Sequence, residues 1–127
     1  MIDRSSGAVA VVDDDQGVLR SLGDLLASAD YAVHSFSSAR ALLQSGCLPE
    51  LDCVISDVDI PGLNGFELVR LIHAIRPGVP IIFITGYPDT LKRLPTLGGS
   101  QARIFTKPFD GPALLAAVAE VLRAARP

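Results

Sequence analysis

Short apolar segments alternate along the chain with stretches whose apolar residues recur at helical spacing, and this alternation limits the fold more than any other feature. The apolar segments predict five strands, at Ala8–Val12, Tyr31–Phe36, Leu51–Ser56, Pro80–Ile84 and Ala102–Thr106. Helices are expected after the first strand up to residue 29, over Ala39–Leu43, from Asn64 to about Ile75, and after Asp110. Strands that alternate with helices form a parallel sheet with helices on both faces. We therefore predict an α/β fold with a doubly wound, five-stranded parallel sheet.

The stretch Pro88–Ser100 departs from this regularity. A further helix is expected there, but Pro95 and the pair Gly98-Gly99 interrupt it. Any helix in this stretch should therefore be short or frayed.

The length, the net charge and the apolar segments of the chain limit the classes of protein to which it can belong. With 127 residues, the chain is expected to form one domain that spans residues 1–127 and has a proper core. A net charge of −3 without a basic run argues against direct binding of nucleic acid. No segment approaches the ~20 apolar residues that span a bilayer, and the first residues lack the pattern of a signal peptide. We therefore expect no membrane contact and a cytoplasmic location.

The cysteines and histidines do not indicate a metal site. Cys53 lies within an apolar stretch and is interpreted as a small core residue, whereas Cys47 falls in a loop. His34 and His73 have no acidic or cysteine neighbours at ligand spacing. Ordinary structural roles are therefore expected for all four.

Three consecutive acidic residues, Asp13-Asp14-Asp15, follow the first predicted strand. They place several negative charges at the carboxyl edge of the sheet. Two carboxylates about 4 Å apart repel each other by roughly 4 kcal/mol at an effective dielectric constant of about 20. A fold retains such a cluster only where a cation, a proton or a basic side chain offsets the charge.

Other polar side chains are predicted at the same edge. Asp57, Thr85 and Lys107 each follow or end a later predicted strand. In open α/β sheets, ligands bind beyond the carboxyl ends of the strands. The convergence of these residues with Asp13 and Asp14 is what predicts a functional site.

Each of these residues also has an ordinary structural interpretation. Asp13 or Asp15 could cap the first helix, and Asp15 is not expected to be a metal ligand. Asp57 could cap a loop, Thr85 is an unremarkable strand-end residue, and a lone lysine such as Lys107 is usually solvated. The functional interpretation depends on all of them together.

Five motifs, in the right order and spacing, resemble those of the receiver domains of two-component response regulators. They are Val11-Val12-Asp13-Asp14-Asp15, Ile55-Ser56-Asp57 with Pro61-Gly62, Asn64-Gly65-Phe66-Glu67-Leu68, Pro80–Gly86 and Phe105-Thr106-Lys107-Pro108-Phe109. The resemblance implies a flavodoxin-like receiver architecture. It also implies phosphorelay signalling, in which a histidine kinase or phosphotransfer protein donates a phosphoryl group to Asp57.

The resemblance further implies a Mg²⁺ site. Asp14 and Asp57 would bind the ion directly, Asp13 would bind it through water, and the backbone carbonyl of Asp59 would complete the protein ligands. Carboxylate and carbonyl oxygens, with several waters retained, suit Mg²⁺. The chain would then be a switch that catalyses only its own phosphorylation and slow dephosphorylation, not a turnover enzyme.

Two further residues receive roles from the resemblance. Lys107 would pair first with Asp57 and later with a phosphoryl oxygen, and Thr85 would donate its hydroxyl to another phosphoryl oxygen. The bond from Lys107 to Pro108 is expected to be a cis peptide.

The chain also departs from the family pattern. Three residues before the lysine the family usually has Tyr or Phe, but this chain has Ile104. Phe105 is adjacent and should point to the opposite face of the sheet, so it cannot simply substitute. The interrupted stretch Pro88–Ser100 occupies the family's fourth helix, and we expect this surface to signal differently or to be poorly ordered without a partner.

Asp59 and Tyr87 lie at the rim of the predicted site. They either tune the lifetime of the acyl phosphate or form an ordinary solvated loop.

Two alternatives remain at the level of the sequence. Asp13, Asp15, Thr85 and Lys107 superficially suit a phosphohydrolase of the haloacid dehalogenase type, but Gln16 replaces the expected glycine and no acidic pair follows the lysine. A pseudo-receiver, which would bind proteins without control by phosphorylation, is the second alternative. The full acidic site argues against it.

The expected partners follow from the resemblance. The chain would be a stand-alone regulator or the receiver of a longer protein, and it would act on an output domain or a downstream protein. It would be a monomer or a phosphorylation-dependent homodimer.

Overall fold

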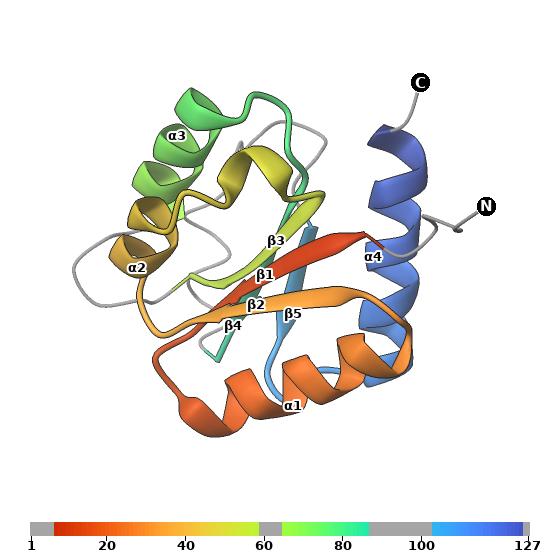
Figure 1. The fold of residues 1–127 in the computed structure, drawn as a ribbon. Helices are drawn as coiled ribbons and strands as arrows, with labels where there is room; N and C mark the ends of the chain where they lie inside the picture. Colours follow the sequence, from red (N-terminus) through yellow and green to blue (C-terminus); the bar gives the residue numbers. More distant parts are fainter. Residues whose placement is uncertain (1–6, 59–64, 87–102, 126–127) are drawn as a thin grey trace.

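The computed structural model of the chain describes residues 7–58, 65–86 and 103–125 (Figure 1). The strands in these residues are β1 (Ala8–Val12), β2 (Ala32–Phe36), β3 (Cys53–Asp57), β4 (Ile81–Thr85) and β5 (Arg103–Thr106). The helices are α1 (Gln16–Ser28), α2 (Ala39–Gln44), the short 3₁₀ helix η1 (Leu48–Glu50), α3 (Gly65–Ile75) and α4 (Gly111–Ala125). The stretch Pro88–Ser100 lies outside the described residues.

The five strands form one parallel sheet in the order β2-β1-β3-β4-β5. This confirms the predicted doubly wound fold. The chain steps outward from β1 to β2, and the next strand, β3, pairs with the other side of β1. The carboxyl ends of β1 and β3 therefore flank the point where the winding direction reverses, which is where ligands bind in such sheets.

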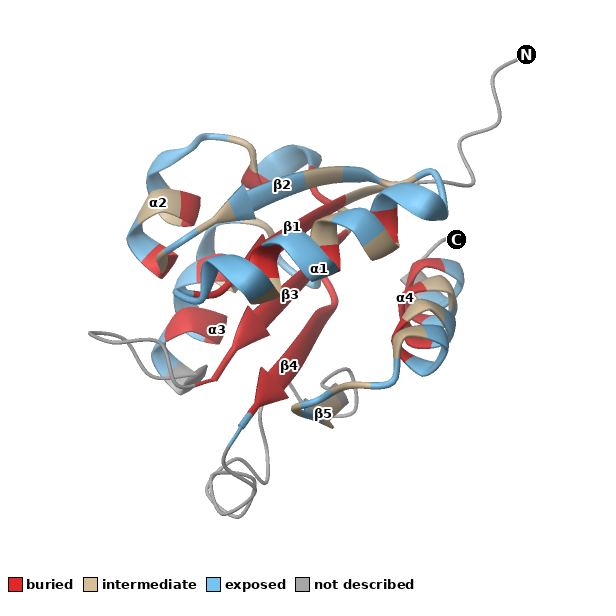
Figure 2. Ribbon diagram, turned by 90° about the horizontal axis from the view of Figure 1, so that it is seen from below, coloured by how far each residue is buried: buried red, intermediate tan, exposed pale blue. Residues whose placement is uncertain are grey.

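Helices cover both faces of the sheet (Figures 1 and 2). One core cluster joins alternate strand residues such as Val9 and Val11 to α1 and α4. A second cluster joins the intervening residues, such as Ala10 and Val12, to α2 and α3. All residues of β3 and β4 are buried, as Figure 2 shows. Burial on both faces explains why these two strands are near-continuous apolar runs in the sequence.

Capping side chains fix where several helices begin. The Asp15 carboxylate accepts hydrogen bonds from the backbone N–H groups of Gly17 and Val18, and Asp110 accepts one from Ala113 N–H. The Asp15 cap agrees with one of the structural roles considered for it from the sequence. Gly46 follows α2 with a φ of +80°, a conformation that L side chains rarely adopt.

The element bounds agree with the expected ones to within two residues, and η1 was not predicted. This 3₁₀ helix is too short to show a period, but it packs Leu48 into the α2–α3 core and contains Pro49, which its first turn tolerates. Cys53 is fully buried, as expected, and burial raises the pKa of its thiol to about 12. Among the helices in residues 7–58, 65–86 and 103–125, none has the length and apolar character to cross a membrane.

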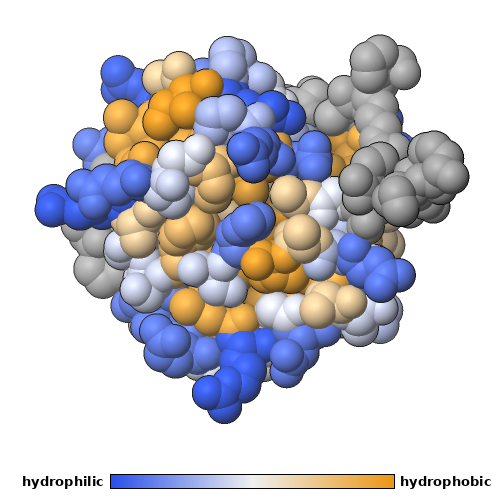
Figure 3. All heavy atoms as spheres, in the orientation of Figure 1, coloured by the Kyte–Doolittle hydropathy of each residue, from blue (hydrophilic) through white to orange (hydrophobic). Residues whose placement is uncertain are grey.

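Apolar side chains also reach the surface in the region of α3 (Figure 3). The large exposed ones among the described residues are Leu71 and Ile75, which are 43% and 46% exposed. They lie one helical turn apart on α3, on the side turned away from the sheet. This surface is therefore on the opposite side of the sheet from α1 and α4.

Candidate functional site

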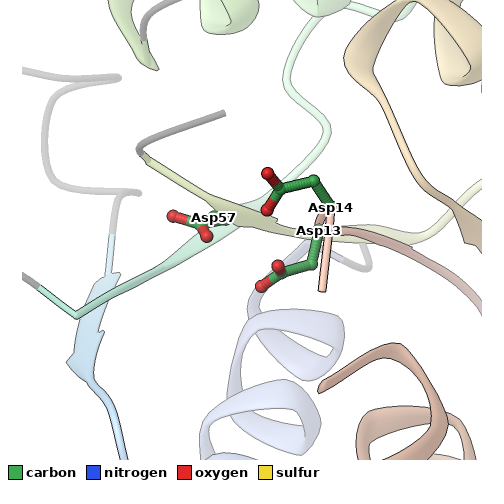
Figure 4. Close-up of side chains that lie close together, drawn as sticks. All are labelled: Asp13, Asp14 and Asp57. Carbon is green, nitrogen blue, oxygen red and sulfur yellow. The ribbon is translucent and has the colours of Figure 1, made fainter. Parts of the chain in front are cut away.

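Three carboxylates converge beyond the carboxyl ends of β1 and β3 (Figure 4). Asp13, Asp14 and Asp57 each offer an oxygen atom, and these atoms all lie within 4.8 Å of one another. The β1–β3 register pairs Val12 with Ser56, so the next residues of the two strands stand side by side. Asp13 and Asp57 are buried, whereas Asp14 is exposed. The cluster therefore has a desolvated base and one side open to solvent.

Lys107 offsets part of this negative charge. Its Nζ lies 2.9 Å from Asp57 Oδ2 and 3.1 Å from Asp13 Oδ2. The Lys107 backbone N–H donates to Thr85 O at 2.7 Å, so the lysine is anchored at the end of β4. The bond from Lys107 to Pro108 is a cis peptide, as expected. A lysine that follows the last strand is thus brought to carboxylates that follow the first and third.

Thr85 lies at the same edge of the sheet. It ends β4, and the β3–β4 register pairs Asp57 with the preceding residue, Ile84. Thr85 is fully buried. The structure therefore brings Asp13, Asp14, Asp57, Thr85 and Lys107 to one place, whereas Asp59 and Tyr87 lie outside the described residues.

Asp13 is the most constrained of the three carboxylates. Its Oδ1 accepts a hydrogen bond from Asp15 N–H at 2.9 Å. Its Oδ2 is buried and forms the ion pair with Lys107 without a well-aligned hydrogen bond. Burial raises the pKa of the Asp13 carboxyl, and the negative charge of Asp57 adds to this, while the Asp15 hydrogen bond and Lys107 oppose it. Ionisation of Asp13 therefore lowers the free energy of unfolding of the protein.

The pKa of Lys107 is shifted by competing effects. Burial alone would lower it, but the hydrogen bond to Asp57 and the negative charges of Asp57 and Asp13 outweigh burial and raise it. Lys107 therefore stays protonated through the physiological range and cannot act as a base there.

These properties fit a divalent cation. The donors are carboxylate oxygens, the ligand type that Mg²⁺ prefers. Three carboxylates also carry more negative charge than one lysine offsets, and the buried Asp13 Oδ2 is left without a well-aligned hydrogen bond. A cation held by Asp14 and Asp57, with Asp13 nearby, would neutralise the excess.

The raised pKa of Asp13 predicts a pH effect on stability in the absence of divalent ions. The folded protein binds this proton more tightly than the unfolded chain does, so stability falls as pH rises from about 3.8 through the raised pKa. Asp13→Asn should remove this loss. We expect the variant to exceed the parent in free energy of unfolding at pH 7 by on the order of 1 kcal/mol. Urea unfolding in EDTA at pH 7 and pH 4 measures this; a gain that does not shrink at pH 4 would contradict it.

Asp15 takes no part in the carboxylate cluster. Its Oδ1 accepts from Gly17 N–H at 2.8 Å and from Val18 N–H at 3.2 Å, at the start of α1. Asp15 is therefore the N-cap of α1, one of the structural roles considered for it from the sequence.

Ile104 and Phe105 pack on opposite sides of β5. Ile104 contacts the core shared by α2 and α3, and Phe105 contacts the core shared by α1 and α4. The register places Ile104 beside the fully buried Phe83. This confirms that Phe105 cannot occupy the position that Ile104 holds.

The structure also reveals a groove that sequence reasoning missed. It encloses about 820 Å³ and lies between the first turns of α1 and the segment that follows β5. Its lining residues are Asp15, Gly17, Val18, Ser21, Gly86, Lys107, Pro108 and Phe109. The two walls are some 90 residues apart in the chain. No local sequence pattern predicts that these two segments lie side by side. Lys107 is shared by the groove and the carboxylate cluster.

Comparisons with known proteins identify the family of the chain. The family model described as "Response regulator receiver domain" matches residues 9–119. The transcriptional regulatory protein FixJ of Azorhizobium caulinodans is 36% identical over 110 residues, which cover 87% of this chain and 52% of FixJ. The response regulator protein TodT of Pseudomonas putida is 34% identical over 125 residues, which cover 98% of this chain and 55% of TodT. The chain thus spans about half the length of these curated relatives.

Solved structures show the same fold. The signal receiver domain of an HD domain-containing protein from Pseudomonas fluorescens Pf-5 superposes with a TM-score of 0.81 at 30% identity, covering 94% of this chain and 96% of that one. Full-length FixJ from B. japonicum gives a TM-score of 0.80 at 36% identity, with 95% of this chain and 60% of FixJ covered. These matches do not support the haloacid dehalogenase or pseudo-receiver alternatives. The chain belongs to the response regulator receiver domains, the signalling switches of two-component phosphorelays.

Proposed function

We propose that residues 1–127 form a receiver in which Asp57 accepts a phosphoryl group from a histidine kinase or phosphotransfer protein in a Mg²⁺-dependent reaction. The observation that carries this proposal is the contact of Lys107 Nζ with Asp57 Oδ2 at 2.9 Å, next to two further carboxylates at the switch point of the sheet. Phosphoryl transfer needs in-line positioning and charge neutralisation more than covalent chemistry, and the positive charge of Lys107 beside Asp57 supports the second of these.

The acceptor step uses one carboxylate oxygen of Asp57. This oxygen forms a bond to phosphorus while the bond from phosphorus to the donor histidine nitrogen breaks. The imidazole leaves with its electron pair, and the product is an acyl phosphate on Asp57. Water would later hydrolyse the acyl phosphate and release inorganic phosphate, which restores the Asp57 carboxylate. The domain itself would set the slow rate of this hydrolysis.

Lys107 and Thr85 would stabilise the transferred group. The ammonium of Lys107 stays charged because its pKa is raised. Once Asp57 is phosphorylated, Lys107 would move its contact to a phosphoryl oxygen, where negative charge has built up. The Thr85 hydroxyl would donate to another phosphoryl oxygen.

The carboxylates would hold the metal ion. Asp14 and Asp57 would be direct ligands, Asp13 would bind through water, and the carbonyl of Asp59 would add a further oxygen. Receiver domains generally bind Mg²⁺ at such an acidic pocket. When bound, the ion neutralises charge on the phosphoryl oxygens as they approach the carboxylates.

The groove beside Lys107 is where the phosphodonor protein would dock. It is lined by the apolar residues Val18 and Phe109 and by the polar residues Ser21 and Asp15, and it shares Lys107 with the carboxylate cluster. A partner helix that carries the donor histidine needs an apolar anchor of this kind with a polar rim.

The output of the switch would lie outside this chain. FixJ is named as a transcriptional regulatory protein and is about twice as long as the matched region. We accordingly infer an output domain or a downstream protein as the target of the phosphorylated receiver, with no direct binding of nucleic acid by residues 1–127. Either a monomer or a phosphorylation-dependent homodimer is consistent with this role.

The proposal is tested with phosphoramidate, a small donor with the same phosphorus–nitrogen bond as phosphohistidine. The initial rate of phosphorylation, followed by intact mass, should rise with Mg²⁺ concentration to a plateau and fall to background in EDTA. Ca²⁺ at the same ionic strength is the matched control, because its larger size and flexible coordination suit this chemistry less well. A rate that is independent of Mg²⁺ would contradict the proposed metal site.

A further inference from the structure

Ser56 is a buried polar residue for which the site described above has no role. It directly precedes Asp57 in β3, and its side chain is fully buried. Its register partners are Val12 on one side and Phe83 on the other, so its neighbours across the sheet are apolar. A hydroxyl in such a layer costs free energy unless it is hydrogen-bonded. Its partner therefore indicates what Ser56 stabilises.

The partner is the backbone of the proposed phosphoacceptor. Ser56 Oγ donates to the carbonyl oxygen of Asp57 at 3.0 Å. The N–H of Val58, which belongs to the same planar peptide group, donates to Ile84 O on β4 at 3.0 Å. Both polar ends of this peptide group are thus held, one by the Ser56 hydroxyl and the other by the sheet.

The position of this peptide group determines the direction in which the chain leaves Asp57. It is the last one of β3, and it joins Asp57 to the segment that begins with Val58 and continues to Asp59. A rotation of its plane would change the backbone dihedral ψ of Asp57 and hence the direction of the chain beyond it. The Ser56 hydroxyl restrains the carbonyl end of this group, in addition to the restraint that the sheet provides at Val58 N–H.

We infer that Ser56 is a positioning residue for phosphoryl transfer: by holding the Asp57–Val58 peptide group, it restrains the backbone dihedral ψ of Asp57 at the point where the chain leaves the phosphoacceptor. This inference rests on the proposed function for its chemical consequence. Its structural part, the restraint of one peptide group, can be measured separately. The hydroxyl faces the α2–α3 side of the sheet, so it acts through the backbone and touches no reacting atom.

Ser56→Ala tests this inference through the exchange of single backbone amides. We expect hydrogen exchange at Val58 N–H to become roughly tenfold faster, beyond any change shared by the other core amides. We also expect phosphorylation by phosphoramidate to slow by roughly tenfold, since even a 1 Å misplacement can cost about 100-fold.

Two variants provide controls. Val54→Ala removes buried side-chain volume two residues earlier on the same strand and face, and should speed exchange of all core amides alike. Ser45→Ala deletes a hydroxyl that donates to the Leu42 carbonyl at 2.7 Å, away from the site, and should leave both readouts unchanged. The inference would be overturned if Ser56→Ala speeds hydrogen exchange at Val58 N–H no more than at the other core amides, which is the pattern expected for Val54→Ala. A parent protein that takes up no phosphoryl group would overturn the proposed function instead, and the Val58 exchange would still decide whether Ser56 restrains the peptide group.

Discussion

Asp57→Asn is expected to abolish phosphoryl uptake from phosphoramidate while leaving the fold intact. An amide oxygen is a far weaker nucleophile than a carboxylate oxygen, and the substitution preserves the shape of the side chain. The remaining carboxylates, Asp13 and Asp14, should not take over the role. Asp13 is constrained by its hydrogen bond to Asp15 N–H and by burial. Intact mass after incubation with Mg²⁺ and donor measures the result.

Asp110→Asn is the matched control for this substitution. Asp110 caps α4 through a hydrogen bond from Ala113 N–H at 3.2 Å, and asparagine caps helices about as well as aspartate. This variant should gain one phosphoryl group at the rate of the parent. Uptake by Asp57→Asn at more than a few per cent of the parent rate would place the acceptor elsewhere.

Lys107→Met is expected to slow phosphorylation by about 10²- to 10³-fold, the range found when a single group that stabilises transition-state charge is removed. The same substitution should not weaken Mg²⁺ binding. Lys107 Nζ contacts Asp57 Oδ2 and Asp13 Oδ2, so its positive charge competes with a metal ion for those oxygens. Isothermal titration with Mg²⁺ and initial phosphorylation rates measure the two effects.

A slower phosphorylation rate without a loss of Mg²⁺ affinity distinguishes a role in phosphoryl transfer from general damage to the site. Arg40→Met, which removes an exposed cation from α2, should change neither the rate nor the Mg²⁺ affinity. Parallel loss of metal binding and rate in Lys107→Met would show that the lysine only supports the structure of the carboxylate cluster.

Much of the fold was predictable because the apolar runs and helical spacings are local properties of the sequence. Strands β3 and β4 are buried on both faces, so their composition alone identified them. The convergence of Asp13, Asp57 and Lys107 followed from one general rule, that parallel strands share a carboxyl edge. The rule does not say which oxygen each amine contacts. That detail depends on side-chain packing over 50 to 94 residues of separation.

Other features had no signal in the sequence. The groove joins α1 to the segment after β5, and its two walls meet only in the folded chain. Ser56 looks like one more strand residue until its bond to the Asp57 carbonyl is seen. Ile104 is the converse case, because the alternation of side chains along a strand correctly predicted that it and Phe105 face opposite cores.

The most direct test of the central claim is to locate the phosphoryl group. After incubation with phosphoramidate and Mg²⁺, borohydride reduction converts an aspartyl phosphate to homoserine, which peptide mass mapping identifies. We expect homoserine at position 57 alone, and none when Mg²⁺ is removed with EDTA. Homoserine at another aspartate, or no modification while titration shows Mg²⁺ bound, would contradict the assignment of Asp57 as the phosphoacceptor.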